Sequence, residues 1–285
     1  MKKVKKIGVT LLKIGVSVLL LFWVFKKIPF GEVWELIIKS NVAYLALALV
    51  AFVLSQVVSS FRLRFFLDTQ SYHLSRRTNW KLYLIGMFYN FFIPGGIGGD
   101  AYKIYILNKK FQWNAKKLTS AIFCDRLVGL VALVVLIQIF AISLFDNFWM
   151  WVLPLTAIAS VLGGYLFFTL LFKTYQSIFA KTFLYSIAVQ LLQSLSIFFI
   201  LKAIAPIDSI AIYLVVFLLS AILSLISFSG IGVREWLFMK AAFYYHFNAQ
   251  TSVSAALIFT LMTAFVSLFG IWYQSRNIFD QKPSS

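Results

Sequence analysis

Charged residues are scarce in this chain of 285 residues, because Asp, Glu, Lys and Arg together make up only 12% of it. Soluble domains carry roughly 25% charged residues, so an ordinary soluble domain is excluded. Apolar residues make up 61% of the chain and aromatic residues 18%. This composition indicates a protein that lives in a lipid environment.

Cysteine and histidine are nearly absent, which excludes several kinds of site. The single cysteine, Cys124, cannot form an internal disulfide. His73 and His246 lie in loops without other ligand residues nearby, so no metal site and no cofactor is expected. The chain also has no Walker A loop, no H-E-x-x-H, no G-x-S-x-G and no cysteine cluster. Nothing therefore points to an ATPase, a zinc protease or a serine hydrolase.

Long apolar runs are what the chain has instead. Stretches of about 20 residues with almost no charge occupy 7–25, 42–61, 127–145, 148–172, 182–201, 210–229 and 252–273. Each can cross a hydrocarbon core of about 30 Å as a helix. The first stretch follows a basic start, as in a signal peptide, but it ends without a small-residue cleavage site, so we expect a retained helix. The sequence predicts an all-α polytopic membrane protein.

The net charge of +17 comes mainly from basic residues in the segments between the apolar runs. Basic loops beside a bilayer set the topology and attract anionic headgroups. The expected partners are therefore anionic membrane lipids and not nucleic acid. Arg62, Arg64, Arg76 and Arg77, in the predicted loop 62–81, are assigned to this role.

A glycine-rich break interrupts the apolar sequence at residues 90–105, which read NFFIPGGIGGDAYKIY. Broken backbone cannot face lipid, because its N–H and C=O groups would lack partners, so it must line protein or a wet cavity. Proline ends the preceding helix, and glycine permits tight turns and close backbone approach. The break is formed by Pro94, Gly95, Gly96, Gly98 and Gly99. A helix that starts after Gly99 would aim free N–H groups at a phosphate or carboxylate, unless Asp100 caps it.

The break has a counterpart at residues 228–240, FSGIGVREWLFMK. Gly96-Ile97-Gly98 aligns with Gly230-Ile231-Gly232, and the same offset along the chain pairs Gln56 with Gln190 and Ser60 with Ser194. We interpret this constant offset as an internal duplication within a single membrane domain, 1–285. The two halves are residues 7–145 and 148–273.

The distribution of basic residues favours a re-entrant path for residues 82–107. If this segment returns to the side it came from, the basic loops gather on the cytoplasmic side with both termini. If it crosses, the bias disappears. Charge does not decide the second segment, 210–247, but the duplication favours the same path. We therefore predict about six crossings plus two re-entrant hairpins, with seven or eight crossings as the alternative, in the cell membrane. Three crossings in each half make an inverted-topology repeat, as in many secondary transporters.

Charges at membrane depth are functional candidates, because they cost several kcal/mol unless they are paired or hydrated. The candidate substrate-binding residues are Asp100, Lys103, Asp125, Arg126, Arg234 and Glu235. Asp100 either binds substrate or serves as a helix cap or ion-pair partner. Lys103, three residues later on the same helix, is one possible partner for such an ion pair. Asp125 and Arg126 either form a structural pair or line the pathway. Arg234 either binds an anionic headgroup or pairs with Asp100. Polar candidates for a cavity are Asn90, Gln56 and Gln190, for which hydrogen bonding between helices is the simpler interpretation.

The motif N-x3-PGGIGGD-x2-K-x-Y at 90–105, Asp125-Arg126-Leu127 at a helix start and FSGIGVRE at 228–235 resemble the signatures of one family. It is the lysylphosphatidylglycerol synthase transmembrane-region family, also called flippase-like. The resemblance runs from about residue 10 to 275. Lys103 stands where arginine is common, which keeps the charge and loses bidentate bonding.

The family includes the membrane half of the multiple-peptide-resistance factor, so the resemblance implies movement of a phosphate-bearing lipid between leaflets. Such lipids include phospholipids, aminoacyl-phospholipids and polyprenyl-linked lipids. No soluble aminoacyltransferase domain is expected in this chain, which argues against an enzyme. The alternatives are a membrane-embedded transferase acting on a lipid phosphate, with Asp100 or Asp125 as base, and a non-transporting subunit of a lipid-modifying complex. A lipid-modifying enzyme and a second copy of the chain are the protein partners considered.

Overall fold

The structure, a computed structural model, describes residues 35, 37–93, 96–145, 148–206, 209–226, 233–245, 248–274 and 279. Every long element in these residues is an α-helix, which confirms the predicted all-α class. The helices are α3 (Val42–Asp68), α4 (Arg76–Phe92), α5 (Gly98–Phe111), α6 (Ala115–Ala141), α7 (Phe148–Leu171), α8 (Phe179–Ile204), α9 (Ile210–Ile226), α10 (Val233–Tyr245) and α11 (Ala249–Gln274). Short 3-10 helices, Ile142–Leu144 and Lys173–Ile178, follow α6 and precede α8.

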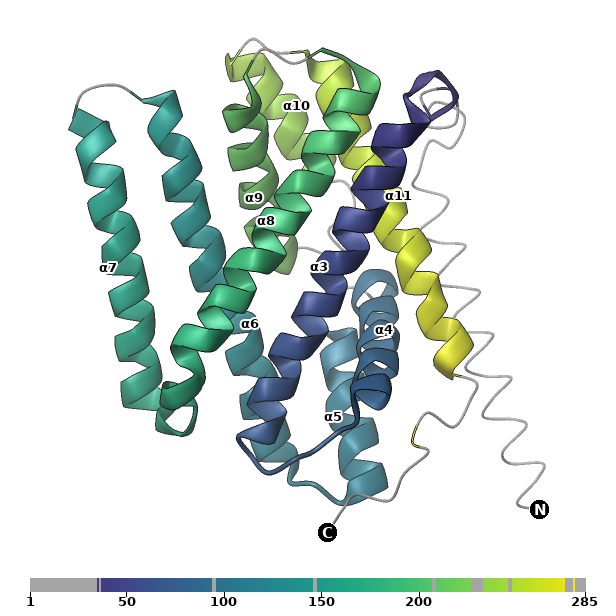
Figure 1. The fold of residues 1–285 in the computed structure, drawn as a ribbon, viewed down its shortest axis with the longest axis vertical. Coiled ribbons are helices and arrows are strands. Elements are labelled where there is room, and N and C mark those ends of the chain that lie inside the picture. Colours follow the sequence, from purple (N-terminus) through teal and green to yellow (C-terminus); the bar gives the residue numbers. More distant parts are fainter. Residues whose placement is uncertain are drawn as a thin grey trace.

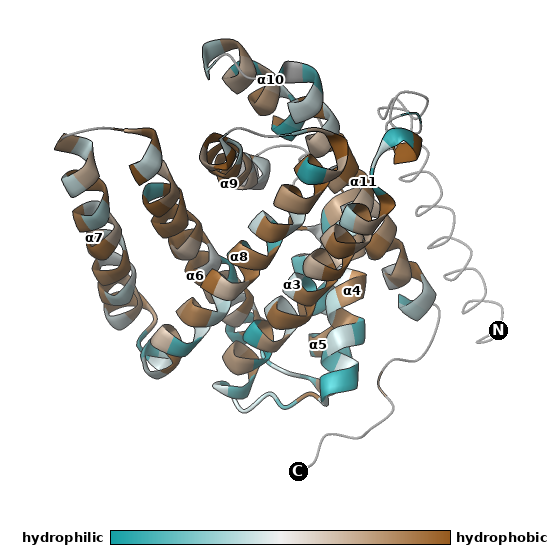
Figure 2. Ribbon diagram, turned by 45° about the horizontal axis from the view of Figure 1, so that its top comes forward, coloured by the Kyte–Doolittle hydropathy of each residue, from teal (hydrophilic) through white to brown (hydrophobic). Residues whose placement is uncertain are grey.

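Five of the described helical segments are long and apolar enough to cross a membrane: Val42–Asp68, Ala115–Leu144, Phe148–Leu171, Lys173–Ile204 and Gln250–Gln274. They cover five of the predicted apolar stretches, and the chain is a multi-pass membrane protein. The stretch 210–229 forms the shorter apolar helix α9. The stretch 7–25 lies outside the described residues. Figure 2 shows brown, hydrophobic residues along α3, α6, α7 and α8, as contact with lipid requires.

Helices α4 and α5 form a hairpin whose two outer ends meet. The ring of Tyr72, just before α4, stacks on Trp113, just after α5, with ring centroids 4.5 Å apart. The Asn114 N–H donates to the Tyr72 hydroxyl over 3.0 Å. The chain therefore returns along α5 to the end at which α4 began (Figure 1). This is the geometry that a re-entrant segment requires, although its depth in a bilayer stays a prediction.

The helix bounds themselves repeat at the offset seen in the sequence. The distance along the chain between Gly96 and Gly230 also separates the first residues of α4 and α9 and the last residues of these two helices. The same distance separates the first residues of α6 and α11. The equivalent helices α3 and α8 lie side by side and run in opposite directions (Figure 1). Ser196 donates to the Ala48 carbonyl over 2.8 Å near one end of this pair, and Arg62 donates to Ser186 near the other. An antiparallel pair of equivalent helices favours the interpretation of an inverted repeat.

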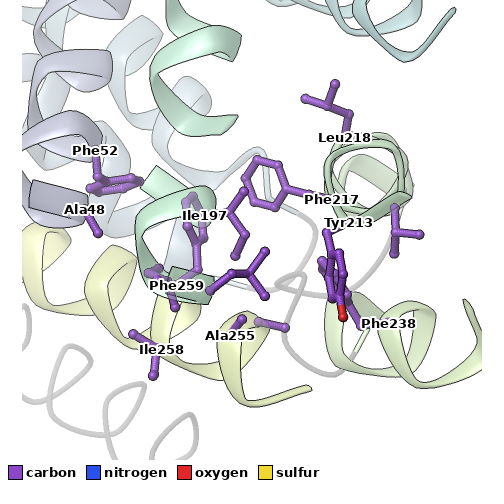
Figure 3. Packing of buried hydrophobic residues seen from close by; sticks show 14 of the residues in the cluster. Ala48, Phe52, Ile197, Tyr213, Phe217, Leu218, Phe238, Ala255, Ile258 and Phe259 are labelled. Atoms are coloured by element: carbon purple, nitrogen blue, oxygen red, sulfur yellow. The ribbon is translucent and has the colours of Figure 1, made fainter. Parts of the chain in front are cut away.

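The largest core cluster joins both halves. Figure 3 shows Phe52 of α3, Ile197 of α8, Phe217 of α9 and Phe259 of α11, all from one buried cluster. Phe259 lies edge-to-face with Phe52 and Phe217, at centroid distances of 5.3 and 4.8 Å. Edge-to-face contacts are favourable because the positive edge of one ring meets the negative face of the other. Two of these rings, Phe52 and Phe259, line the site described next.

One predicted loop is wrong in its bounds. The expected loop 62–81 begins only after Asp68, because α3 continues past its apolar stretch, and it ends where α4 begins at Arg76. Arg62 on α3 and Lys103 on α5 are buried, with 6% and 5% of their surface exposed. Both are paired with carboxylates, and this pairing explains why the helices can carry them.

Candidate functional site

Helices α9 and α10 pack against each other in the second half and form the second hairpin of the site. A cavity of about 300 Å³ lies where they approach the α4–α5 hairpin. Its lining comes from both halves: Phe52, Gln56, Tyr83, Met87, Asn90, Phe91, Gly96, Lys103, Arg126, Gln193, Ala221, Ser224, Arg234, Phe259, Thr260 and Thr263. A methyl group on Gly96, at the tip of the first hairpin, would lie 4.0 Å from the Ser224 carbonyl oxygen near the end of α9. Lys103, Arg126 and Arg234 bring three positive charges to this one space.

Asp100 opens α5 and is held by two of these cations. Its Oδ2 accepts from Arg126 Nε, and its Oδ1 accepts from Lys103 Nζ over 3.3 Å. Asn90 Nδ2 lies 3.5 Å from the same Oδ1, while Asn90 Oδ1 accepts from the Gly99 N–H over 2.7 Å. Asn90 thus caps α5 from the neighbouring helix, and Asp100 does not act as the side-chain cap. The expected local pair with Lys103 is present, together with a partner from α6.

Close backbone approach allows this arrangement. A Cβ on Gly99 would overlap the carbonyl oxygen of Gly86, so α4 and α5 meet at a glycine pair. A Cβ on Gly86 would also overlap Cε of Lys103. Because Gly86 has no side chain, the Lys103 stem passes over α4, and its Nζ lies 5.2 Å from the centroid of the Tyr83 ring. Gly86 stands within an ordinary helical run, so the sequence analysis did not single it out.

Arg234 opens α10 on the opposite side of the cavity. Its Nε donates to Ser220 Oγ over 3.2 Å. Its guanidinium carbon lies 5.3 Å from the centroid of Phe217 and 4.7 Å from that of Phe259. Among the described residues, the ion pairs of Asp100 are with Lys103 and Arg126, and none joins it to Arg234. The predicted alternative of an Asp100–Arg234 pair is therefore wrong, because Asp100 is already satisfied within its own half.

Glu235, the residue after Arg234, lies outside the cavity lining. Its Oε1 accepts from Thr260 Oγ1 of α11 over 3.0 Å. In the first half, Arg126 occupies the position equivalent to Thr260 and donates to Asp100. Asp100 lies in the first turn of α5, and Glu235 lies in the first turn of α10. Each half therefore has a polar contact between its hairpin and the long helix that follows, from an arginine in the first half and from a threonine in the second.

A sequence model of the lysylphosphatidylglycerol synthase TM region matches residues 10–181, which is more than half of the chain. The chain belongs to this family. A search of curated proteins found no match. The family indicates a membrane protein related to lipid handling. The matched region of this family member contains Asp100, Lys103 and Arg126, whereas Arg234 lies beyond it.

Asp125 does not line the cavity and does not pair with Arg126, so neither predicted alternative describes Asp125. Its oxygens accept from Nε and Nη2 of Arg62 over 2.8 and 3.2 Å, and Nη1 of Arg62 donates to Ser186 over 2.9 Å. Gly129, one turn after Asp125, leaves room for the guanidinium, since a Cβ there would lie 3.1 Å from Nη1. This group joins α3, α6 and α8. The prediction that Arg62 serves topology and headgroup contacts is wrong, because Arg62 is a buried helix-pairing residue.

The polar candidates divide between the cavity and the helix interfaces. Gln56 lines the cavity and accepts a hydrogen bond from the Tyr83 hydroxyl over 3.1 Å. Gln190 lies on α8 outside the lining and is buried, and its Oε1 has no hydrogen-bond partner.

The glycines of the first break are described only in part. Gly98 packs beneath Ile93, and Gly96 adopts a left-handed φ of 62° that favours glycine. Pro94, Gly95, Gly230 and Gly232 lie outside the described residues.

Several residues that line the cavity were not predicted from the sequence, above all Tyr83, Ser224, Thr260 and Thr263. The repeat could have found two of them: Ser224 is the equivalent of Asn90, and Thr260 is the equivalent of Arg126. Met87 and Ala221 form a third equivalent pair in the lining. Such convergence of equivalent residues is what the predicted inverted repeat implies, because a cavity at its axis takes its walls from both halves. Among the described residues, no group of three His, Cys, Asp or Glu side chains could hold a metal ion.

Proposed function

We propose that this protein moves a lipid with a phosphate-bearing headgroup between the two leaflets of the cell membrane, with its N-terminus on the cytoplasmic side. The observation that carries the proposal is the convergence of Lys103, Arg126 and Arg234 on one cavity between two helical hairpins. Cations in a water-poor site bind phosphate oxygens strongly, because little water screens them. Polar groups beside them, such as Gln56 and Thr263, can bond the rest of a headgroup.

The size of the cavity supports a headgroup site. About 300 Å³ is at the small end of ligand pockets, so it suits a headgroup and not a whole lipid. The acyl chains would stay in the bilayer while the headgroup takes the polar path. In inverted-repeat transporters, access alternates when one repeat rocks against the other around a central site. The meeting of both hairpins at this cavity fits such a mechanism.

The contacts of the acids argue against the alternative of a membrane-embedded transferase. A general base needs a carboxylate that is free to take a proton from a reacting group. Asp100 is bound by two cations, and Asp125 is bound by Nε and Nη2 of Arg62. Neither is in the state that a base requires, so the proposal assigns them to positioning and to helix association.

Arg234→Ala is expected to lower the rate of translocation of a fluorescent phosphatidylglycerol at least tenfold in reconstituted vesicles, because the second half then offers no cation to the phosphate. Asp100→Asn is expected to have a similar effect, because it releases Lys103 and Arg126 from their positions. Arg77→Ala, an exposed arginine outside the cavity, is the matched control and should leave the rate unchanged. Wild-type rates in both Arg234→Ala and Asp100→Asn, with folding retained on size-exclusion chromatography, would refute the proposal.

A further inference from the structure

We propose that the cavity selects lipids by headgroup charge: it accepts a headgroup whose ionised group is a phosphate and rejects a headgroup that carries an ammonium, aminoacylated lipids included. This inference rests on the proposed function and narrows its substrate class. It concerns binding, so it can be tested separately from translocation.

The carboxylate that lies among the cavity cations, Asp100, is already engaged by two of them. The described residues that line it include three cations and no carboxylate. Asp100, the acid nearest to these cations, has one oxygen bound by Arg126 and the other by Lys103, and its side chain is 12% exposed. A headgroup ammonium that entered would find no acid ready to receive it.

The other two acids near the middle of the fold do not line the cavity. Asp125 is held by Arg62, at 2.8 and 3.2 Å. Glu235 bonds Thr260 and lies outside the lining. Lys103, Arg126 and Arg234 exceed Asp100 and Glu235 by one positive charge even when both acids are counted. One phosphate anion balances that excess, whereas a zwitterionic or cationic headgroup does not.

Aromatic faces offer the second common way to bind an ammonium, and here the protein's own cations occupy them. The guanidinium of Arg234 lies over Phe217 and Phe259, and Lys103 Nζ lies over Tyr83. Aromatic rings recognise substituted ammonium ligands through these same faces. The remaining lining rings make edge-to-face ring contacts, Phe52 with Phe259 and Phe91 with Phe92.

Rejection then follows from like charge. An ammonium in the cavity would lie among three fixed cations in a medium that screens poorly. Specificity of this kind comes from the repulsive element as well as from the attractive one. Phosphatidylglycerol and phosphatidate share the anionic phosphate without an ammonium, and they differ in whether the phosphate is a diester or a monoester. Both fit the proposal.

Native mass spectrometry of the full-length protein can test the selection with lipids of identical acyl chains. The probes are phosphatidylglycerol, phosphatidate, phosphatidylethanolamine and lysyl-phosphatidylglycerol. We expect the two lipids with an ammonium to bind at least tenfold more weakly than phosphatidylglycerol. The affinity for phosphatidate relative to that for phosphatidylglycerol shows whether the cavity prefers a phosphate monoester or a diester. Lysyl-phosphatidylglycerol binding within threefold of phosphatidylglycerol would overturn the inference and leave the proposed transport untouched. Saturable binding of none of the four would overturn the headgroup site itself.

Arg126→Gln tests the cause of the selection. This change removes one cation and frees an oxygen of Asp100, so phosphatidylglycerol should bind less tightly and the ratio to lysyl-phosphatidylglycerol should narrow at least fivefold. Arg234→Gln removes a cation without touching Asp100 and should also narrow the ratio, which keeps the test available if the first variant folds poorly. Arg64→Gln, outside the cavity lining, should leave the ratio unchanged. An unaltered ratio in both cavity variants would refute charge as the cause.

Discussion

Arg62→Ala is expected to lower the free energy of unfolding by about 3–5 kcal/mol, the range found when one partner of a buried ion pair is removed. Asp125 would then remain buried without the guanidinium that holds both its oxygens. Its side chain is only 11% exposed, so water cannot replace the lost partner. Denaturant unfolding in detergent micelles, followed by circular dichroism, measures the loss.

Arg64→Ala on the same helix provides the matched control. Arg64 pairs with Asp68 over 3.4 Å, but both side chains are about 30% exposed, so the expected loss is below about 1 kcal/mol. The double variant Arg62→Met with Asp125→Leu should recover most of the stability, because it leaves no unpaired charge. It should also keep lipid translocation, since neither residue lines the cavity. A double variant as unstable as Arg62→Ala would contradict this account.

Gly99→Ala is expected to prevent α4 and α5 from meeting and to abolish both folding of the hairpin and lipid binding. A Cβ at Gly99 overlaps the carbonyl oxygen of Gly86, and backbone cannot move aside as a flexible side chain can. Separation of the two helices would also displace Asn90 and Asp100, which are bonded across the hairpin. The measurement is the yield of monodisperse protein together with its melting temperature.

Gly163→Ala is the matched control for Gly99→Ala, because it makes the same substitution within a helix. A Cβ at Gly163, on the exposed surface of α7, meets nothing within 4 Å. Alanine has the higher helix propensity, by about 1 kcal/mol, so this variant should be as stable as the wild type or slightly more stable. Equal melting temperatures of Gly99→Ala and Gly163→Ala would show that the glycine contact is not required.

Much of the architecture could be predicted because it depends on local pattern. Five apolar stretches became long helices, since about 20 apolar residues form a helix in lipid whatever surrounds them. The offset between the two glycine breaks reappears in the bounds of α4 and α9. Helix ends were harder to predict: α3 continues to Asp68 because a charge such as Arg62 is tolerated once a partner neutralises it. Hydropathy alone ends the helix at the first charge.

Within the candidate site, the sequence by itself determined which residues carry charge beside the two glycine breaks, because few other charges fall within apolar sequence. Only the tertiary structure decided their partners. Asp100 pairs with Arg126, and Asp125 pairs with Arg62 on another helix instead of with its neighbour. Adjacent residues on a helix point in directions about 100° apart, so Asp125 and Arg126 face different helices. Which helix each one meets depends on how the helices cross, and that is set by close contacts such as the one between Gly86 and Gly99.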